Sequence, residues 1–522
     1  MTSQDAHAGE GLTQHALDGV MWTAAQRWAI RISGFATVLV LTRLLSPESF
    51  GTVAVALTIL PLTYALADLG FSTYIMQVER IGERTLDTAF WFTTVTGLIL
   101  AGGLVGLAPV AAAMFHRADV ASVIRGVAPA IGLVTLTTVP MALLRRQMRF
   151  RALAVQSVLG GIVGQVVAVV LALTGFGVWA LVGQTIAGQV VVSALAWSAA
   201  RWRPGFGMSL TEFRAMASFG TKVVGVELVA TVRGLVENAV IAGALGVTGL
   251  GYLSIAQRLT QVMQDVTAAA ILPVSTVLFA RVRDAQDRLR HAYLRALTFS
   301  YAVIVPAMVF LVITAPSLLP LLFGRAWQPS VRPSQILAVI SILVLGALLD
   351  HGLFYGAGRP GRWFVYAIAV DGLTVLAAVI SARHGMEAWA YGFLTVASLA
   401  TVLRWPLVGR LVGASSAAIG WVFLRAMLIG LVGAGAGWAI AAATPAFPPV
   451  VGIALVGLGI GLAHALAMRL FLRDAWADAV QIVRTRLGAR TARARSAEVA
   501  VEGAGPSPRV AVPIGGPGHG TD

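Results

Sequence analysis

The chain has 522 residues, of which 57% are hydrophobic and only 12% are charged, and its mean hydropathy is +0.82. Because about a quarter of the residues in a soluble domain are charged, this composition excludes an ordinary soluble protein and indicates a polytopic membrane protein. The sequence has no cysteine, which excludes disulfides and cysteine-ligated metals. Its net charge of +15 comes from arginines in short loops between apolar runs, so it requires no nucleic-acid partner.

Apolar runs long enough to cross about 30 Å of hydrocarbon as helices recur along the chain. We place about fourteen of them, near 20–43, 50–77, 87–115, 120–144, 153–173, 176–200, 217–245, 251–280, 292–323, 333–357, 361–382, 386–409, 418–443 and 448–472. The polar start of the chain, residues 1–18, lacks the charged segment and cleavage site of a signal peptide. The sequence therefore predicts an all-α polytopic membrane protein whose first helix is an uncleaved anchor.

Arginines divide unequally between the two sets of loops. Those after even-numbered spans hold Arg80, Arg84, Arg145, Arg146, Arg149, Arg151, Arg201, Arg203, Arg214, Arg281, Arg283, Arg288, Arg290, Arg359, Arg362, Arg404 and Arg410. The odd-numbered loops hold few. Since cytoplasmic loops carry the excess of arginine, this pattern predicts that both termini face the cytoplasm.

The first half of the chain is weakly repeated in the second half. The segment SPESFGTVAVA around Gly51 corresponds to GVTGLGYLSIA around Gly251, and GFGVWALVGQTIAGQVV around Trp179 corresponds to GMEAWAYGFLTVASLATVL around Trp389. Helices 1–6 thus repeat as helices 7–12 in the same orientation, as two parallel-repeat lobes around a central cavity.

This repeat sets the predicted organisation of the chain. The predicted parts are a cytoplasmic tail (1–18), an N-lobe (19–205), a C-lobe (206–412), two C-terminal helices (413–473) and a cytoplasmic basic tail (474–522). In that tail we expect a basic helix on the membrane surface over 474–495, followed by a disordered Pro/Gly-rich end.

The first span carries Arg27 and Arg31 four residues apart, and therefore on one face of a helix. A guanidinium near the bilayer centre costs about 3 kcal/mol by insertion scales, so we expect both to face a wet cavity. Helix 7 carries Lys222, Arg233 and Glu237 on one face with Glu227 beside it, and helix 8 carries Ser254, Arg258, Gln261 and Asp265. A ligand with concentrated negative charge, such as a diphosphate, fits such a cationic wall because arginine binds phosphate oxygens in bidentate fashion.

The same residues have a structural interpretation. Arg233 with Glu237, and Arg258 with Asp265, would neutralise each other as ion pairs. Carboxylates at Asp68, Glu227, Glu237, Asp265 and Asp371 are candidates for coupling transport to an H⁺ or Na⁺ gradient. We interpret Asp350 and His351 as the surface end of the tenth helix.

Motifs for nucleotides, metals and nucleophilic catalysis are absent from the sequence, so we expect no enzyme activity, cofactor or ATPase. Glycines spaced four apart predict close helix packing instead. These pairs are Gly102/Gly106, Gly160/Gly164 and Gly433/Gly437.

Several segments together resemble the Wzx-type polysaccharide and lipopolysaccharide flippases of the MOP superfamily, which also holds the MATE exporters and lipid II flippases. The similar features are the opening G-x-x-W of residues 19–22, RLLSPESFG, ADLGFS, LRRQMRF, GFGVWALV and GYLSIAQRL. The resemblance covers about residues 17–475 and is strongest over the first 200.

This resemblance implies a V-shaped, two-lobed fold and a substrate, an undecaprenyl-diphosphate-linked oligosaccharide that crosses the bacterial cytoplasmic (inner) membrane by alternating access. It implies that Arg27 and Arg31 face the cavity, that membrane lipids surround the protein, and that a polysaccharide polymerase and export machinery are partners. Loose sugar specificity would come from residues such as Gln165, Gln184, Gln261 and Trp179.

Three other functions remain open. A MATE-type multidrug antiporter would favour acidic cavity walls for organic cations, whereas a lipid II flippase would share the cationic cavity and fourteen helices. A membrane-embedded polymerase or ligase would need a large extracytoplasmic loop, and the outward loops here are short.

Overall fold

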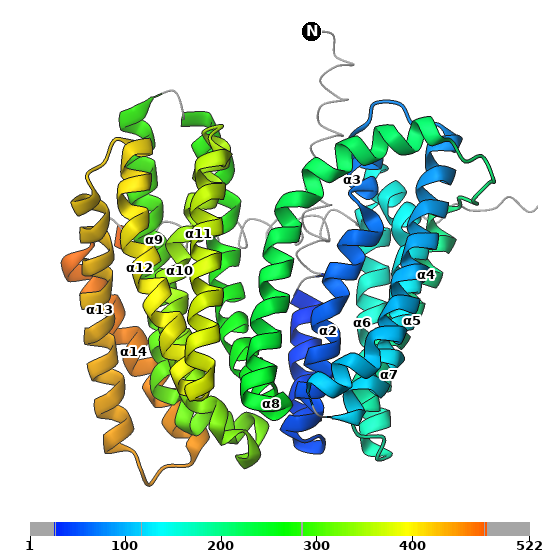
Figure 1. Ribbon diagram of the computed structural model, residues 1–522. Helices are drawn as coiled ribbons and strands as arrows, with labels where there is room; N and C mark the ends of the chain where they lie inside the picture. The colour runs from blue at the N-terminus through cyan, green and yellow to red at the C-terminus, as the bar shows by residue number, and fades with distance from the viewer. Residues whose placement is uncertain (1–25, 27, 116, 283–284, 474–475, 478–522) are drawn as a thin grey trace, which may run out of the picture. The chain divides into compact units, whose positions relative to one another are not determined.

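The computed structural model describes residue 26 and residues 28–115, 117–282, 285–473 and 476–477. Side chains are described in these ranges except at 221–227, 229–230, 266–278, 280–282 and 360. Throughout them the secondary structure is helical, without a strand (Figure 1). Residues 28–44 belong to the first helix. The others are α2 (Pro47–Asp68), α3 (Phe71–Gln77), α4 (Glu83–Met114), α5 (Ala118–Arg146), α6 (Phe150–Leu173), α7 (Trp179–Ala200), α8 (Leu210–Val282), α9 (Gln286–Phe323), α10 (Val331–Gly356), α11 (Pro360–Ser381), α12 (Met386–Val412), α13 (Ser416–Ala443) and α14 (Pro449–Phe471), with 3-10 turns η1 (Arg325–Ser330) and η2 (Ala382–His384).

Twelve helices of the described residues are long and apolar enough to span a membrane. Two further spans follow from the first helix, described only over 28–44, and from α8, which Gly246 divides with a φ of 72° and a ψ of 172°. The two parts of α8 correspond to the predicted spans 217–245 and 251–280. The prediction of an all-α polytopic membrane protein is confirmed, with twelve candidate spans among the described residues.

The second span departs from the prediction, because α2 and α3 replace a single helix over 50–77. Leu69 and Gly70 are left-handed, with φ of 44° and 75°, and they separate the two helices. The Asp68 carboxylate accepts hydrogen bonds from the Ser72 backbone N–H at 3.1 Å and from its hydroxyl at 2.7 Å, which fixes the turn. A side-chain cap and a glycine at the turn thus end α2 early.

Chain contacts divide the molecule into two compact units, Met1–His464 and Ala465–Asp522. In the first unit α4, α5, α6 and α7 pack together, as do α9, α10, α12 and α13, while α8 packs on both α2 and α10 (Figure 1). The second unit is described only over 465–473 and 476–477, so the predicted surface helix and the Pro/Gly-rich end lie almost wholly outside the described residues.

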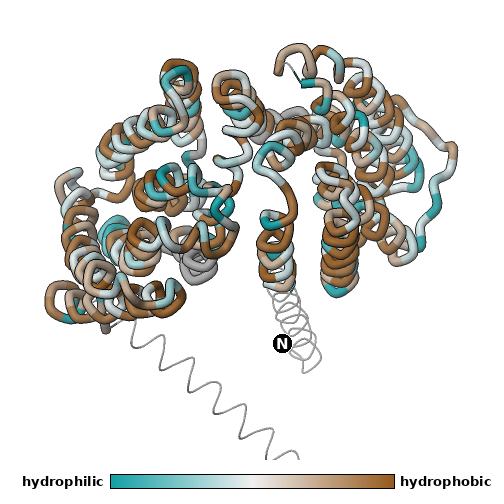
Figure 2. The backbone as a smooth tube through the Cα atoms, turned by 90° about the horizontal axis from the view of Figure 1, so that it is seen from below, coloured by the Kyte–Doolittle hydropathy of each residue, from teal (hydrophilic) through white to brown (hydrophobic). Residues whose placement is uncertain are grey.

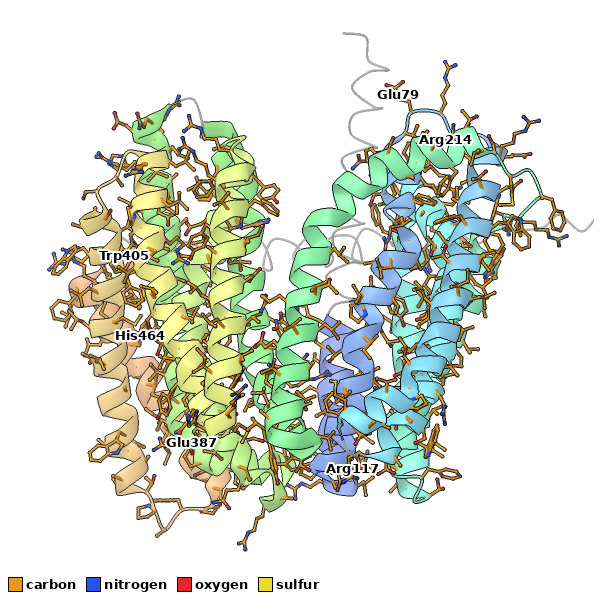
Figure 3. The ribbon with its side chains drawn as sticks, in the orientation of Figure 1. Glu79, Arg117, Arg214, Glu387, Trp405 and His464 are labelled. Atoms are coloured by element: carbon orange, nitrogen blue, oxygen red, sulfur yellow. The ribbon has the colours of Figure 1, made fainter. Side chains whose placement is uncertain are left out.

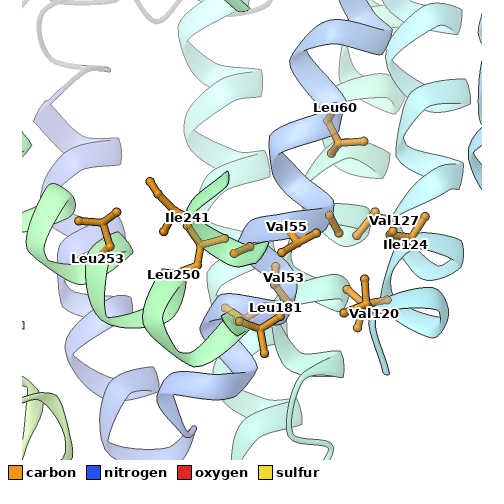
Figure 4. Close-up of a cluster of buried hydrophobic side chains, with 14 of the residues drawn as sticks. Val53, Val55, Leu60, Val120, Ile124, Val127, Leu181, Ile241, Leu250 and Leu253 are labelled. Carbon is orange, nitrogen blue, oxygen red and sulfur yellow. The ribbon is translucent and has the colours of Figure 1, made fainter. Parts of the chain in front are cut away.

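Two apolar clusters form most of the interior of the first unit. One joins α2, α5, α7 and α8 through buried side chains such as Val53, Ile124, Leu181 and Leu250 (Figure 4). The other surrounds α9 and α10. Hydrophobic residues, brown in Figure 2, also run along outward-turned faces, where Leu98, Ile99 and Leu431 are about 60% exposed or more. Apolar side chains both inside and outside are typical of a protein surrounded by lipid.

Only some of the glycine pairs lie at close contacts. A Cβ atom on Gly164 would approach the Gln184 carbonyl of α7 to 2.6 Å, and one on Gly160 would approach the Gly188 carbonyl to 2.9 Å, which confirms close packing of α6 on α7. Gly437 lies equally close to Ile460. At Gly102 and Gly106 a Cβ atom would meet nothing within 4 Å, so the prediction for that pair is wrong. Both glycines are exposed on α4, and no neighbouring helix packs against them there.

Candidate functional site

The two halves of the first unit meet where α2 crosses α8. A Cβ atom on Gly51 would collide with the Val247 carbonyl and lie 3.0 Å from the Gly251 nitrogen. A Cβ atom on Gly251 would collide with the Pro47 carbonyl and lie 3.1 Å from the Gly51 nitrogen. Only glycine at both positions permits this backbone contact. Gly51 and Gly251 are also the positions that the internal repeat makes equivalent.

Aromatic rings close the same end of the helices. Trp327 is fully buried, and its indole N–H donates to the Thr42 carbonyl at 3.0 Å. The rings of Phe50 and Tyr252 contact the indole edge-on, with distances between ring centroids of 5.2 and 6.1 Å. Ser330 donates to the Tyr252 carbonyl at 2.8 Å. These contacts tie the first helix, α2, α8 and η1 together at one end.

Arg117 lies at this end, opposite Glu79 and Arg214 (Figure 3). Its guanidinium pairs with Glu48 and, at 2.9 Å, with Asp119. The hydrogen bond to Asp119 and the charge of Glu48 raise the pKa of Arg117. The pairing joins the turn before α5 to the start of α2.

A cavity of about 480 Å³ lies beside the second part of α8. That helix contributes Ser254, Gln257, Arg258, Thr260, Gln261 and Gln264, and the other side is formed by Leu337, Ile340, Ser341 and Val344 of α10 and by Phe393 of α12. Most of the α8 residues recur every three or four positions, so they share one helix face. The cavity therefore has one polar wall and one largely apolar wall, as ligand pockets of this size usually do.

Arg258 is the cation of that polar wall. No ion pair among the described residues includes it. Its guanidinium reaches from α8 toward the first helix, where a Cβ atom on Gly34 would lie 3.3 Å from Arg258 Nη2 and 3.7 Å from Gln165 Nε2 of α6. The absence of a side chain at Gly34 leaves room for the guanidinium, which no carboxylate in the described part of the chain neutralises.

Arg31 pairs with Asp265, the residue that was expected to pair with Arg258. Its Nη2 lies 2.9 Å from Asp265 Oδ1, which also accepts a hydrogen bond from Gln261 at 3.0 Å. The alternative that Asp265 neutralises Arg258 is therefore wrong, since its partner is Arg31 on the first helix. The Arg31 side chain is 37% exposed, so the pair is accessible.

Arg233 lies between two acidic partners. Its Nη1 is 3.0 Å from Glu237 Oε2 one turn along α8, and its Nε is 3.0 Å from Asp371 Oδ1 of α11. The three side chains carry a formal charge of −1 together. The structure thus brings three of the predicted site residues into one cluster and confirms the expected Arg233–Glu237 pair.

Some predicted residues cannot be placed, and others lie elsewhere. Arg27 lies outside the described residues, and the side chains of Lys222 and Glu227 are not described. Asp68 is bonded to Ser72, as noted above. Gln184 and Trp179 do not line the cavity beside α8.

Residues 40–332, more than half of the chain, match the family described as polysaccharide biosynthesis protein. The chain belongs to this family. It is 27% identical over 374 residues to the succinoglycan biosynthesis transport protein ExoT of Rhizobium meliloti, covering 72% of this chain and 76% of the relative. It is 23% identical to the lipopolysaccharide biosynthesis protein WzxC of Escherichia coli, covering 76% and 81%. The resemblance to Wzx-type proteins is confirmed.

Solved structures share the fold of this family member. The lipid II flippase MurJ in an inward closed conformation matches with a TM-score of 0.70 at 13% identity, over 87% of this chain and 99% of that one. An inward-facing multidrug resistance MATE family transporter of the MOP superfamily matches with a TM-score of 0.57 at 18% identity, over 76% and 95%. The chain is thus a multi-pass membrane protein of the MOP fold.

One ion pair of this family member was not predicted. We expected Arg404 in a cytoplasmic loop and Asp350 at a surface helix end, and both expectations are wrong. Arg404 lies inside α12 and Asp350 inside α10, they are 2% and 0% exposed, and Arg404 Nε lies 2.8 Å from Asp350 Oδ2. Tyr293 of α9 donates to Asp350 Oδ1 at 2.7 Å. The apolar residues TVL and WPL on either side of Arg404 were a signal that it belongs to the span.

A second cavity of about 170 Å³ lies beside this pair. It is bounded by α10, α11 and α12, and both Asp371 and Arg404 line it. Phe393 and Val344 line both cavities. Asp371 of the acidic cluster and Arg404 of the buried pair therefore face a common space.

Proposed function

We propose that this protein is a flippase that moves undecaprenyl-diphosphate-linked oligosaccharide repeat units across the bacterial cytoplasmic membrane by alternating access. The Arg258 guanidinium in the cavity beside α8, which forms no ion pair with any described residue, is the single observation that carries the proposal. The relatives supply the substrate class, since ExoT is described as a succinoglycan biosynthesis transport protein and WzxC as a lipopolysaccharide biosynthesis protein.

A lipid diphosphate loses its hydration when its headgroup leaves the membrane surface. Burying an isolated charge without compensation is far too costly for spontaneous crossing. A guanidinium with no competing carboxylate replaces water by charge-assisted hydrogen bonds in a fork geometry. Arg258 supplies that group, and the accessible Arg31 on the facing first helix supplies a second one when Asp265 releases it. The polyisoprenoid chain meanwhile stays in the bilayer.

The arginine-rich loops orient the protein in this proposal. They include the loop of Glu79 and Arg80 and the segment before Arg214, at the end opposite Arg117 and the Gly51–Gly251 contact (Figure 3). If those loops and both termini face the cytoplasm, the glycine contact is the outward seal. This conformation then receives substrate from the cytoplasmic leaflet, and separation of α2 from α8 releases it outward.

Energy for uphill transport comes from an ion gradient or from downstream use of the substrate. Glu237 and Asp371 are our coupling candidates, because they hold Arg233 between α8 and α11 and because Asp371 lines the smaller cavity. An H⁺ or Na⁺ that binds either carboxylate weakens its hold on Arg233 and so changes the contact between those helices. A polysaccharide polymerase and export machinery are the partners that would take up the product.

Lipid II transport is the second candidate, since the fold neighbour MurJ is a lipid II flippase and a cationic cavity suits both substrates. A multidrug antiporter fits poorly, because the charged side chain that lines the cavity among the described residues, Arg258, is positive and repels organic cations.

Reconstitution distinguishes these functions. Proteoliposomes containing the full-length chain are loaded with an undecaprenyl-diphosphate-linked oligosaccharide, lipid II or ethidium, and movement to the other leaflet or compartment is followed. We expect movement of the oligosaccharide carrier, and its loss in Arg258→Ala. Transport of ethidium alone, or of none of the three, would refute the proposal, whereas transport of lipid II alone would assign the second function.

A further inference from the structure

The cavity beside α8 contains more polar groups than a diphosphate needs. Arg258 provides the cation, yet amides and hydroxyls make up the rest of the polar wall: Ser254, Gln257, Thr260, Gln261, Gln264 and Ser341. None of these is charged. A site for phosphate alone would be expected to collect further cations, so the surplus of neutral groups indicates a neutral polar part of the ligand.

We infer that this wall is a monosaccharide subsite, in which Gln257 holds the hydroxyls of the sugar attached directly to the diphosphate. The inference rests on the proposed function and deepens it. It assigns the first sugar a defined place next to Arg258, so that selectivity resides in a few amides of α8.

The amides of the wall differ in how they are held. Gln264 Nε2 donates to Ser341 Oγ of α10 at 2.8 Å, and Gln261 Nε2 donates to Asp265 at 3.0 Å. These hydrogen bonds orient both donors. Gln257 is exposed to the cavity and has no hydrogen bond to another described residue. Its amide therefore offers both a donor and an acceptor, the combination that matches the neighbouring hydroxyls of a pyranose.

The order of the side chains along α8 determines how the phosphate and the sugar of the ligand are oriented in the cavity. Gln257 and Arg258 are adjacent, and Gln261 and Gln264 follow on the same face. A phosphate on Arg258 thus places the next sugar against the amides. Phe393 of α12 lines the opposite side, where its ring provides an apolar surface for the C–H face of the sugar. The volume of about 480 Å³ suits one or two sugars better than a long oligosaccharide, which would extend into the open.

Binding of carriers with and without sugar tests the inference. The full-length protein in nanodiscs is titrated with undecaprenyl diphosphate and with the same carrier bearing glucose, galactose or N-acetylglucosamine. We expect at least one sugar-bearing carrier to bind more tightly than the bare carrier. Gln257→Ala should weaken binding of that sugar-bearing carrier about tenfold, the loss of roughly one hydrogen bond, and leave binding of the bare carrier unchanged.

Gln286→Ala, at an exposed glutamine at the start of α9, is the matched control and should change neither affinity. Gln257→Asn keeps the amide on a shorter arm and should alter the ranking of the three sugars rather than abolish binding. Equal binding of all four carriers by the native protein, or equal loss of bare and sugar-bearing carriers in Gln257→Ala, would overturn the subsite. A protein that binds none of the carriers would instead contradict the proposed function itself.

Discussion

Gly51 of α2 and Gly251 of α8 lie backbone against backbone, and a Cβ atom on either would collide with a carbonyl group of the other helix. The arrangement is reciprocal, because the Val247 carbonyl faces Gly51 and the Pro47 carbonyl faces Gly251. Equivalent positions of the internal repeat thus meet at one contact. Because this contact requires that neither residue carries a side chain, a methyl group added at either position should open it.

Gly51→Ala should therefore separate α2 from α8. The reporter is a cysteine at Leu250, which is 2% exposed beside the contact, and the native chain has no cysteine of its own. We expect maleimide to label Leu250→Cys several-fold faster in the Gly51→Ala background, because the added methyl group cannot fit. Gly102→Ala, where a Cβ atom meets nothing within 4 Å, is the control and should leave the rate unchanged. Equal rates in all three backgrounds would show that the contact closes nothing.

The spans and the equivalence of the two glycines follow from local information in the sequence. Hydropathy places the fourteen spans, and the break in α8 falls at Gly246 between two predicted helices. The repeat made Gly51 and Gly251 equivalent, although it did not say that they touch. The break after Asp68 also had a local signal, because Gly70 and Ser72 follow at the spacing of a left-handed turn and a side-chain cap.

Side-chain partners could not be predicted in the same way. The face of α8 that carries Arg258 was predicted from spacing, but Asp265 lies on that face too, and only the fold shows that it reaches Arg31. Asp350 and Arg404 are more than fifty positions apart and become partners only when α10 packs on α12. Such pairs depend on long-range packing of helices, which cannot be inferred from helical periodicity.

Arg258 variants separate charge from geometry. Arg258→Ala should abolish transport of the oligosaccharide carrier in proteoliposomes, since no other described cation lines the cavity without a partner. Arg258→Lys keeps the charge but loses the planar fork, and we expect about a tenfold loss, comparable to one charge-assisted hydrogen bond. Arg80→Ala, at an exposed loop position, should be silent. Full activity of Arg258→Ala would remove the basis of the proposed function.

The first helix provides a test in cells. Arg27→Ala and Arg31→Ala should each abolish polysaccharide export while the protein still reaches the membrane. For Arg31 the structure adds a double variant, because a purely structural pair with Asp265 would tolerate removal of both charges. We expect Arg31→Ala with Asp265→Ala to remain inactive, as a ligand role requires. Restored secretion in the double variant would instead make Arg31 a structural residue.

The buried pair of the C-terminal half is expected to affect stability. Asp350→Asn or Arg404→Leu leaves one charge uncompensated at a site that is 0–2% exposed, and breaking such a pair costs about 3–5 kcal/mol. The double variant Asp350→Leu with Arg404→Leu removes both charges and should lose less stability than the less stable of the two single variants. Thermal unfolding in detergent ranks the variants by stability, with the exposed Arg410→Ala as control. Single variants as stable as the native protein would show that the pair contributes little.

Asp371 tests whether the acidic cluster couples transport to an ion gradient. Arg233 lies 3.0 Å from both Asp371 and Glu237, so Asp371→Asn leaves a neutral 1:1 pair on α8 and removes the charge that holds α11. If that carboxylate carries the coupling ion, the variant should still equilibrate the oligosaccharide carrier between leaflets but should no longer respond to an imposed H⁺ or Na⁺ gradient. Glu387→Gln, at the start of α12 and in neither cavity, should keep the response of the native protein. A gradient response that survives in both Asp371→Asn and Glu237→Gln would place coupling outside this cluster.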